Sequence, residues 1–131
     1  MIDRFSEIRI VGIDNSRSAF AAPTSEIVNF VLTLSASAPK EWADLFNDEW
    51  EHHIYRCKRA AYVNASTLRI ECPFAELESR HLPELRRVVA KINYRYGELF
   101  ERERRELNRR AALDAERSRE IEEYGKRIKF D

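Results

Sequence analysis

The adjacent histidines His52 and His53 have the clearest potential for metal or acid–base chemistry in this sequence. Each follows an acidic residue, Asp48 or Glu49, by four positions, so on a helix each histidine shares a face with a carboxylate. A zinc site needs three or four ligands, and neither a His-Glu-x-x-His nor a Cys-x-x-Cys spacing supplies the others. We therefore expect no metal and no cofactor at this pair.

No other pattern selects a reaction. A Gly-x-Ser-x-Gly nucleophile motif is absent, and three glycines in all are too few for a phosphate-binding loop. His81 precedes Leu82-Pro83 at an expected helix break, where it would cap a carbonyl or face water. These observations favour a protein without catalytic activity.

The two cysteines, Cys57 and Cys72, are too few for a disulfide scaffold and fit a reducing compartment. The strand-like runs 59–64 and 67–72 could form a hairpin around a two-residue turn at Asn64-Ala65. Cys57 would then lie opposite Cys72. A different loop length removes that pairing, and the interpretation we adopt is two reduced, buried thiols.

The elements that would position these side chains follow from hydrophobic periodicity. The pattern predicts an α+β fold with an antiparallel or mixed sheet of about four strands, in ββαββα order, and helices on one face. Ala19 to Pro23 form a connection between the first two strands. Pro83 should break or kink the chain and so separate two helices. The expected strands are 5–13, 26–34, 59–64 and 67–72, and the expected helices are 39–55, 74–82 and one beginning at Glu84.

Length and charge bound the possible functions. With 131 residues, the chain has room for one ordinary domain and an appendage. Its 23 basic and 23 acidic residues cancel, so net charge gives no reason to expect nucleic acid or a membrane surface as a partner. The longest apolar run, Ile27 to Leu34, is too short to span a bilayer, and acidic residues near the N-terminus argue against a secretory signal. We expect a cytoplasmic location.

The last third of the chain concentrates the charge. Acidic residues precede basic ones by four positions, as in Glu106–Arg110 and Glu122–Lys126, which supports a solvated helix. We expect an α+β domain over residues 1–100 and a charged helical extension over residues 101–131. Heptad fragments suggest a coiled coil, but Asp114 and Glu106 interrupt them. The apolar residues expected to contact a partner or a second copy are Leu99, Phe100, Leu107, Leu113, Ile121, Tyr124 and Ile128.

Two functional hypotheses follow. The first is a cytoplasmic protein-interaction module, acting as an adaptor, inhibitor or regulatory subunit, that uses this helix for docking or as a homodimer. The second is a nucleic-acid-binding domain, whose affinity would fall steeply with salt. A small-ligand pocket is a third idea for which no sequence feature speaks. The basic residues available to the second hypothesis are Arg56, Lys58, Arg59, Arg86 and Arg87.

Overall fold

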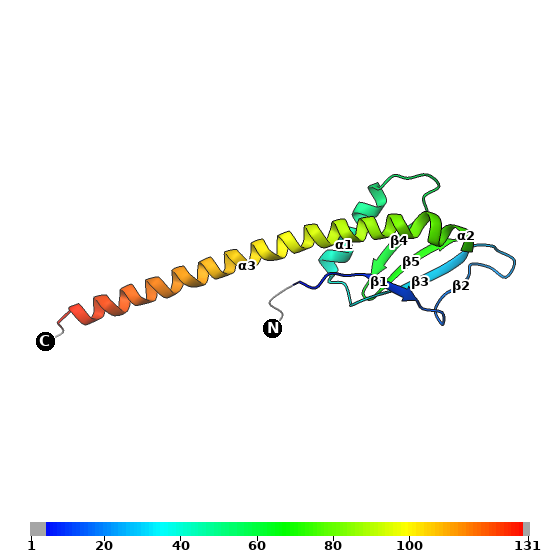
Figure 1. The fold of residues 1–131 in the computed structure, drawn as a ribbon. Coiled ribbons are helices and arrows are strands. Elements are labelled where there is room, and N and C mark those ends of the chain that lie inside the picture. Colours follow the sequence, from blue (N-terminus) through cyan, green and yellow to red (C-terminus); the bar gives the residue numbers. More distant parts are fainter. Residues whose placement is uncertain (1–4, 130–131) are drawn as a thin grey trace. The chain divides into compact units, whose positions relative to one another are not determined.

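The computed structural model describes residues 5–129 and shows an α+β fold (Figure 1). The chain divides into two compact units, residues 1–96 and residues 97–131. The first unit contains a five-stranded sheet, the helix α1 and the beginning of the long helix α3. The second unit is the remainder of α3 and the residues that follow it.

All strand pairs in the sheet are antiparallel, in the order β1-β3-β5-β4. The strand β3 is central because it pairs with β5 along one edge and with β1 and β2 along the other. Leu32 and Phe30 pair with Leu68 and Ile70 on the helix-covered face. The sequence predicted about four strands; a fifth, the two-residue β2, pairs with β3 beside β1. The strands are β1 (Ile10–Ile13), β2 (Ala19–Phe20), β3 (Val28–Leu34), β4 (Ala61–Asn64) and β5 (Thr67–Cys72).

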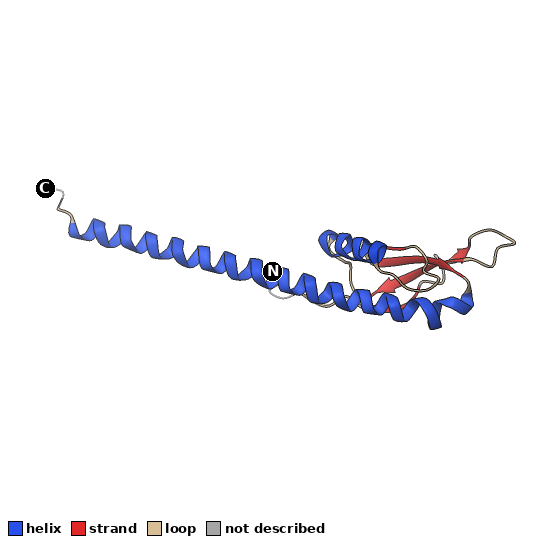
Figure 2. Ribbon diagram, turned by 90° about the horizontal axis from the view of Figure 1, so that it is seen from above, coloured by secondary structure: helices blue, strands red, loops and turns tan. Residues whose placement is uncertain are grey.

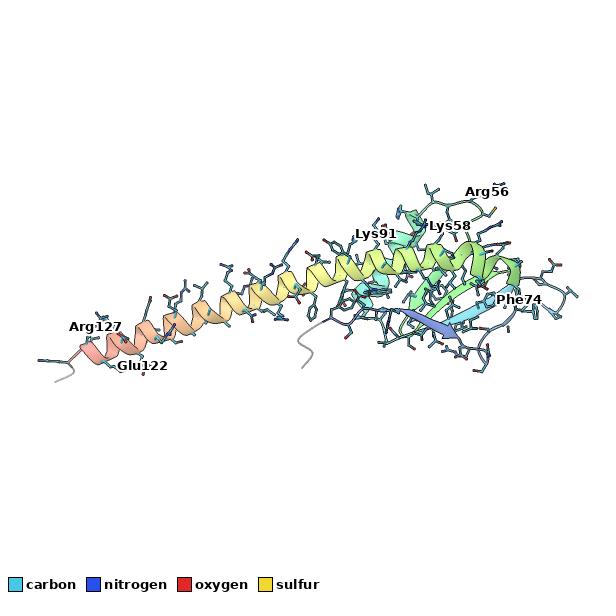
Figure 3. All side chains as sticks on the ribbon, in the orientation of Figure 1. Arg56, Lys58, Phe74, Lys91, Glu122 and Arg127 are labelled. Carbon is cyan, nitrogen blue, oxygen red and sulfur yellow. The ribbon has the colours of Figure 1, made fainter. Side chains whose placement is uncertain are left out.

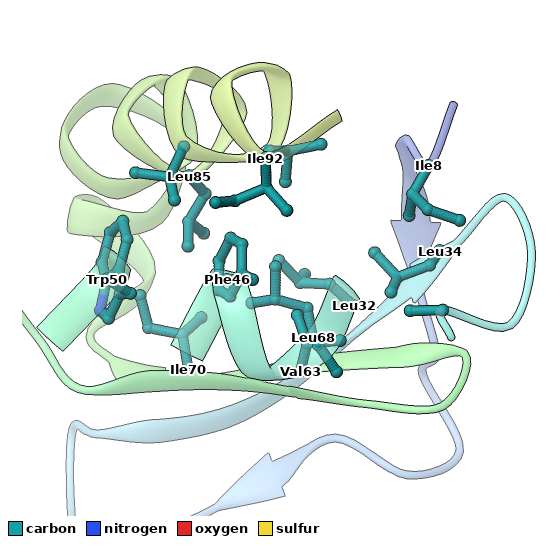
Figure 4. Packing of buried hydrophobic residues seen from close by; sticks show 14 of the residues in the cluster. Ile8, Leu32, Leu34, Phe46, Trp50, Val63, Leu68, Ile70, Leu85 and Ile92 are labelled. Atoms are coloured by element: carbon teal, nitrogen blue, oxygen red, sulfur yellow. The ribbon is translucent and has the colours of Figure 1, made fainter. Parts of the chain in front are cut away.

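Two helices supply the other side of the core. The helix α1 spans Lys40–His52, and α3 spans Leu82–Arg127 (Figure 2). Phe46 and Trp50 from α1, with Leu85 and Ile92 from α3, meet the apolar face of the sheet (Figure 4). Helices therefore cover one face, as the sequence predicted.

Pro83 does not separate two helices, and that prediction was wrong. The short helix α2 (Phe74–Glu76) leads into a π-helical turn, η1 (Leu77–His81), which continues directly into α3. The Leu82 N–H donates to the Leu77 carbonyl, five residues earlier. Pro83 thus lies in the first turn of α3, where a residue without an N–H is tolerated.

The hairpin turn lies one residue later than predicted, so each β4 residue pairs two residues further along β5 than expected. Asn64 pairs with Thr67, so the turn is Ala65-Ser66, and Ala65 adopts a φ of 54°. Cys57 falls before β4 and is exposed, whereas Cys72 pairs with Val28 and is buried. The expectation that the two thiols lie opposite each other and are both buried is therefore wrong.

A buried amide ties three elements of the first unit together. The Asn93 Oδ1 on α3 accepts hydrogen bonds from the Ile8 N–H and the Trp42 Nε1–H, each 3.0 Å long. The Asn93 Nδ2 donates to the Ile8 carbonyl at 2.8 Å. One side chain thus fixes both the N-terminal segment and α1 to α3.

Candidate functional site

The C-terminal segment, residues 97–129, contains every residue predicted to contact a partner. None of its residues is buried, and every residue from 107 to 127 is exposed. Residues 97–127 belong to α3, which ends at Arg127. At 1.5 Å per residue, this part of the helix is about 46 Å long.

Large apolar side chains stand exposed on this segment. Leu107 is 64% exposed, Ile121 73% and Tyr124 62%, although each could contribute about 1.5–3 kcal/mol if buried. Phe100, Leu107 and Ile121 are separated by multiples of seven residues, so they follow one line along α3, and Ile128 comes seven residues later, just after the helix ends. Phe100 and Ile128 are half-buried. The remaining predicted contacts, Leu99 and Leu113, are each 43% exposed.

Charged residues on the segment pair locally. The Arg109 guanidinium reaches the Glu106 carboxylate at 2.7 Å, and Arg110 reaches the same carboxylate at 3.3 Å. The hydrogen bond from Arg109 lowers the pKa of Glu106. The Glu122–Lys126 pair, at 3.9 Å, is looser. Exposed pairs of this kind add little stability each, so they support the helix without replacing a buried face.

Charge is also distributed unevenly along the segment. Residues 102–110 contain five arginines and two glutamates, a net charge of +3. Residues 114–124 contain five acidic residues and two arginines, a net charge of −3. The segment therefore has a basic first half and an acidic second half, with Ala111 to Leu113 between them.

Three of the five basic residues considered for nucleic-acid binding make hydrogen bonds or ion pairs within the chain. Lys58 donates to the carbonyls of Trp50 and Glu51, and Arg87 pairs with Glu84 at 3.3 Å. Arg59 binds Glu76 through two hydrogen bonds of 3.2 Å.

Arg56 and Arg86 make no ion pair with a described residue. Arg56 lies near Lys58 on the connection between α1 and β4 (Figure 3), whereas Arg86 is on α3. The five basic side chains thus come from two parts of the chain, the connection between α1 and β4 and the beginning of α3, and three of them already make contacts within the chain.

Sequence reasoning missed a partly buried chain of polar side chains in the first unit. The Tyr55 hydroxyl lies 2.7 Å from the His81 Nδ1, and the His81 Nε2 lies 2.9 Å from the Glu76 Oε1. His81 is fully buried, so the expectation that it caps a carbonyl or faces water was wrong. Arg59 completes the chain by binding Glu76. The partners come from the connection between α1 and β4, from α2 and from η1, and no motif in the sequence reveals them.

Burial and hydrogen bonding set the protonation of this chain. Burial raises the pKa of Tyr55 to about 12, so its hydroxyl keeps its proton, and it lies within hydrogen-bond distance of the His81 Nδ1. Hydrogen bonds from Arg59 and then His81 lower the pKa of Glu76 to about 2. A protonated phenol is a poor nucleophile, and each polar group already has a partner. The arrangement is therefore suited to holding η1 in place.

The histidine pair predicted as a metal candidate splits into two separate environments. The His52 Nδ1 lies 2.8 Å from the Asp48 carbonyl, and the His53 Nε2 lies 2.9 Å from the Glu84 carboxylate. Over residues 5–129, His, Cys, Asp and Glu side chains nowhere form a group of three that could hold a metal ion.

One apolar hollow lies on the first unit. It has a volume of about 580 Å³ and lies between the sheet and the residues of α2, η1 and the start of α3. Phe20 and Phe74 form its walls. Their rings pack edge to face at 5.7 Å, and they are 55% and 64% exposed. Glu78 and Arg86 lie at its polar rim. This volume is in the range of small-molecule sites, roughly 300–1,000 Å³.

Wider comparisons complete the description of the candidate site. None of the helices between residues 5 and 129 combines the length and the apolar character needed to cross a bilayer. Comparison of the chain with protein-family models, with curated proteins and with solved structures gave no match in any of the three.

Proposed function

We propose that this protein is a protein-interaction module that associates through its C-terminal segment, residues 97–129, and that its partner is a second copy of the chain. The observation that carries the proposal is the exposure of Leu107, Ile121 and Tyr124 on a segment in which no residue is buried. Covering large apolar side chains on a helix with a second helix removes them from water, which lowers the free energy of the pair.

A protein partner fits this surface better than nucleic acid. Each arginine cluster of the segment has glutamates beside it, and ten acidic residues balance ten basic ones over residues 97–131. Nucleic acid would require a basic face kept apart from acidic groups. A helix whose two halves carry opposite charge instead complements a partner of the same composition. Affinity that falls steeply with salt, lost after Arg56 and Arg86 are replaced, would support the nucleic-acid alternative.

The biological role we propose is that of a dimeric adaptor, inhibitor or regulatory subunit without catalytic activity. The free thiols of Cys57 and Cys72 suit a reducing compartment such as the cytoplasm. The hydrogen-bonded chain from Tyr55 to Arg59 is a structural feature in this account, because its polar groups satisfy one another.

The test is the oligomeric state of full-length variants. A Leu107→Ser, Ile121→Ser double variant removes two apolar contacts without adding charge, and it should sediment as a monomer where the wild type forms a dimer. The matched control is Arg102→Ser with Glu116→Ser, since both residues lie on the side of α3 opposite Leu107 and Ile121. The proposal would be contradicted if the Leu107→Ser, Ile121→Ser variant still formed a dimer, or if the Arg102→Ser, Glu116→Ser control also became a monomer.

A further inference from the structure

We propose that two copies of the C-terminal segment pair antiparallel, with Leu107 of one copy facing Ser118 of the other. The inference rests on the proposed self-association and adds to it the direction and the register of the two helices. The centre of the pairing then falls between Ala112 and Leu113. Three features of the segment agree on this register: the sizes of facing side chains, the charges within the contact line and the distribution of charge along the helix.

Two adjacent lines on the helix differ in side-chain size. The first line holds the large residues at intervals of seven, broken by one acidic residue. The second line runs three residues before the first, so the two lines form the a and d positions of one contact seam. Its members are small, with one arginine among them. The first line is Phe100, Leu107, Asp114, Ile121 and Ile128, and the second is Gly97, Arg104, Ala111, Ser118 and Gly125.

The antiparallel arrangement sets three of the four large residues against a small one, whereas Ile121 faces Arg104. Phe100 faces Gly125 as Leu107 faces Ser118, because reversing one helix brings the first line of one copy against the second line of its partner. Small residues allow two helices to approach closely, and the large side chain then fills the space beside them. A parallel arrangement in register would instead stack Gly125 on Gly125 and leave space there.

Charge within the contact line decides the direction. In a parallel pair in register, Asp114 would meet Asp114 and Arg104 would meet Arg104, and burying like charges together is strongly unfavourable. In the antiparallel register, Asp114 lies beside Ala111 and Arg110 of the other copy. In the antiparallel register the two charged residues of these lines, Asp114 and Arg104, each face a residue that does not repeat their charge.

The partner of Arg104 follows from the same register. Arg104 lies against Ile121 and beside Glu122, so its aliphatic stem can cover the isoleucine while its guanidinium reaches the carboxylate. At the edges of the contact, Arg110 approaches Arg117 and Glu101 approaches Glu122. Those edge positions are exposed in the free helix and are screened by salt, so they oppose the register weakly.

The charge distribution along the segment favours the same direction. Residues 102–110 carry a net charge of +3, and residues 114–124 carry a net charge of −3. Reversal about the point between Ala112 and Leu113 brings the middle of the basic stretch, Glu106, opposite Arg119, the middle of the acidic stretch. Each half of one helix thus faces the oppositely charged half of the other, whereas a parallel pair would set like against like.

Disulfide trapping tests the register directly in the full-length chain. The background is Cys57→Ser, since the exposed Cys57 thiol could cross-link by itself. Leu107→Cys and Ser118→Cys are prepared separately, then oxidised alone and as a mixture. A disulfide requires Cα atoms within about 7 Å, whereas two copies of residue 107 lie roughly 16 Å apart along an antiparallel pair. We therefore expect a covalent dimer in the mixture and none in either protein alone.

Controls separate the register from the association itself. Arg109→Cys mixed with Glu116→Cys has the same symmetry but lies on the outer side of the helix, so it should stay uncross-linked. Ala111→Cys mixed with Asp114→Cys repeats the test while every large apolar side chain stays in place. A covalent dimer from Leu107→Cys alone would show a parallel pair. If the Cys57→Ser protein sediments as a dimer but neither the Leu107→Cys/Ser118→Cys mixture nor the Ala111→Cys/Asp114→Cys mixture forms a disulfide, this register is refuted. If the Cys57→Ser protein sediments as a monomer, the proposed function is refuted as well.

Discussion

Replacement of Asn93 by leucine should strongly destabilise the first unit, because the amide satisfies three buried polar groups at once. These are the Trp42 indole N–H and the N–H and carbonyl of Ile8. Leucine is close to asparagine in size, so the change removes hydrogen bonds while leaving little empty space. The free energy of unfolding should fall for that reason alone.

The magnitude follows from where these groups lie. Trp42 is fully buried, so an unpaired indole N–H there costs about 1–3 kcal/mol. The Ile8 groups can reach water only if the N-terminal segment lifts away, which loses the burial of the Ile8 side chain, about 1.5–3 kcal/mol. The total is about 2.5–6 kcal/mol, a large share of the stability of an ordinary domain.

Urea denaturation followed by tryptophan fluorescence measures this change. Both tryptophans, Trp42 and Trp50, belong to the first unit, so the signal reports its unfolding. Tyr94→Leu is the matched control, because the neighbouring Tyr94 is exposed on the same helix and its replacement should change the free energy by less than about 0.5 kcal/mol.

A double-mutant cycle with Trp42→Phe isolates the Asn93–Trp42 hydrogen bond. If the indole N–H contributes as described, Asn93→Leu should cost about 1–3 kcal/mol less in the Trp42→Phe background. Additive effects of the two substitutions, or a cost below about 1 kcal/mol for Asn93→Leu alone, would refute this reasoning.

Three further predictions concern the first unit. Hydrogen bonds from Arg59 and His81 lower the Glu76 pKa from 4.5 to about 2, so the stability they give is complete above about pH 4.5 and is lost as the pH falls to about 2. In Glu76→Gln, the midpoint of urea denaturation should therefore change less over this pH range than it does in the wild type. Ala65→Gly should raise the free energy of unfolding by about 0.5 kcal/mol in the same assay, since a φ of 54° strains alanine. By mass spectrometry, a thiol reagent should label Cys57 in the native protein and Cys72 only after unfolding, because burial raises the Cys72 pKa to about 11; native labelling of both would contradict the fold.

The regular parts of the fold could be predicted because their pattern is local. Leu32 and Leu68 lie on apolar alternations long enough to identify β3 and β5, and the stripe from Trp42 to Trp50 identifies α1. The strand β2 was missed because two residues, Ala19–Phe20, carry no periodicity. Its place depends on a distant contact, the Ser18 hydroxyl accepting the Val31 N–H at 2.8 Å.

The errors arise where the chain departs from common local geometry. A turn with φ above zero usually favours glycine or asparagine, so Ala65 gave no signal for the register of its hairpin. Pro83 is normally a helix breaker, but the π turn before it places it in a first helical turn.

The contact between His81 and Tyr55 is tertiary, since the two residues lie 26 positions apart in sequence. The exposed stripe of the C-terminal segment could be listed from the sequence because helical spacing alone defines it. What covers that stripe depends on another molecule, which neither local pattern nor the fold of one chain specifies.

The molar mass of the full-length protein in solution, measured by light scattering over a range of concentrations, tests the central claim most directly. Association through the C-terminal segment predicts twice the 15.5 kDa of one chain, with dissociation on dilution. A mass of one chain at every concentration would contradict self-association and the antiparallel pairing built on it.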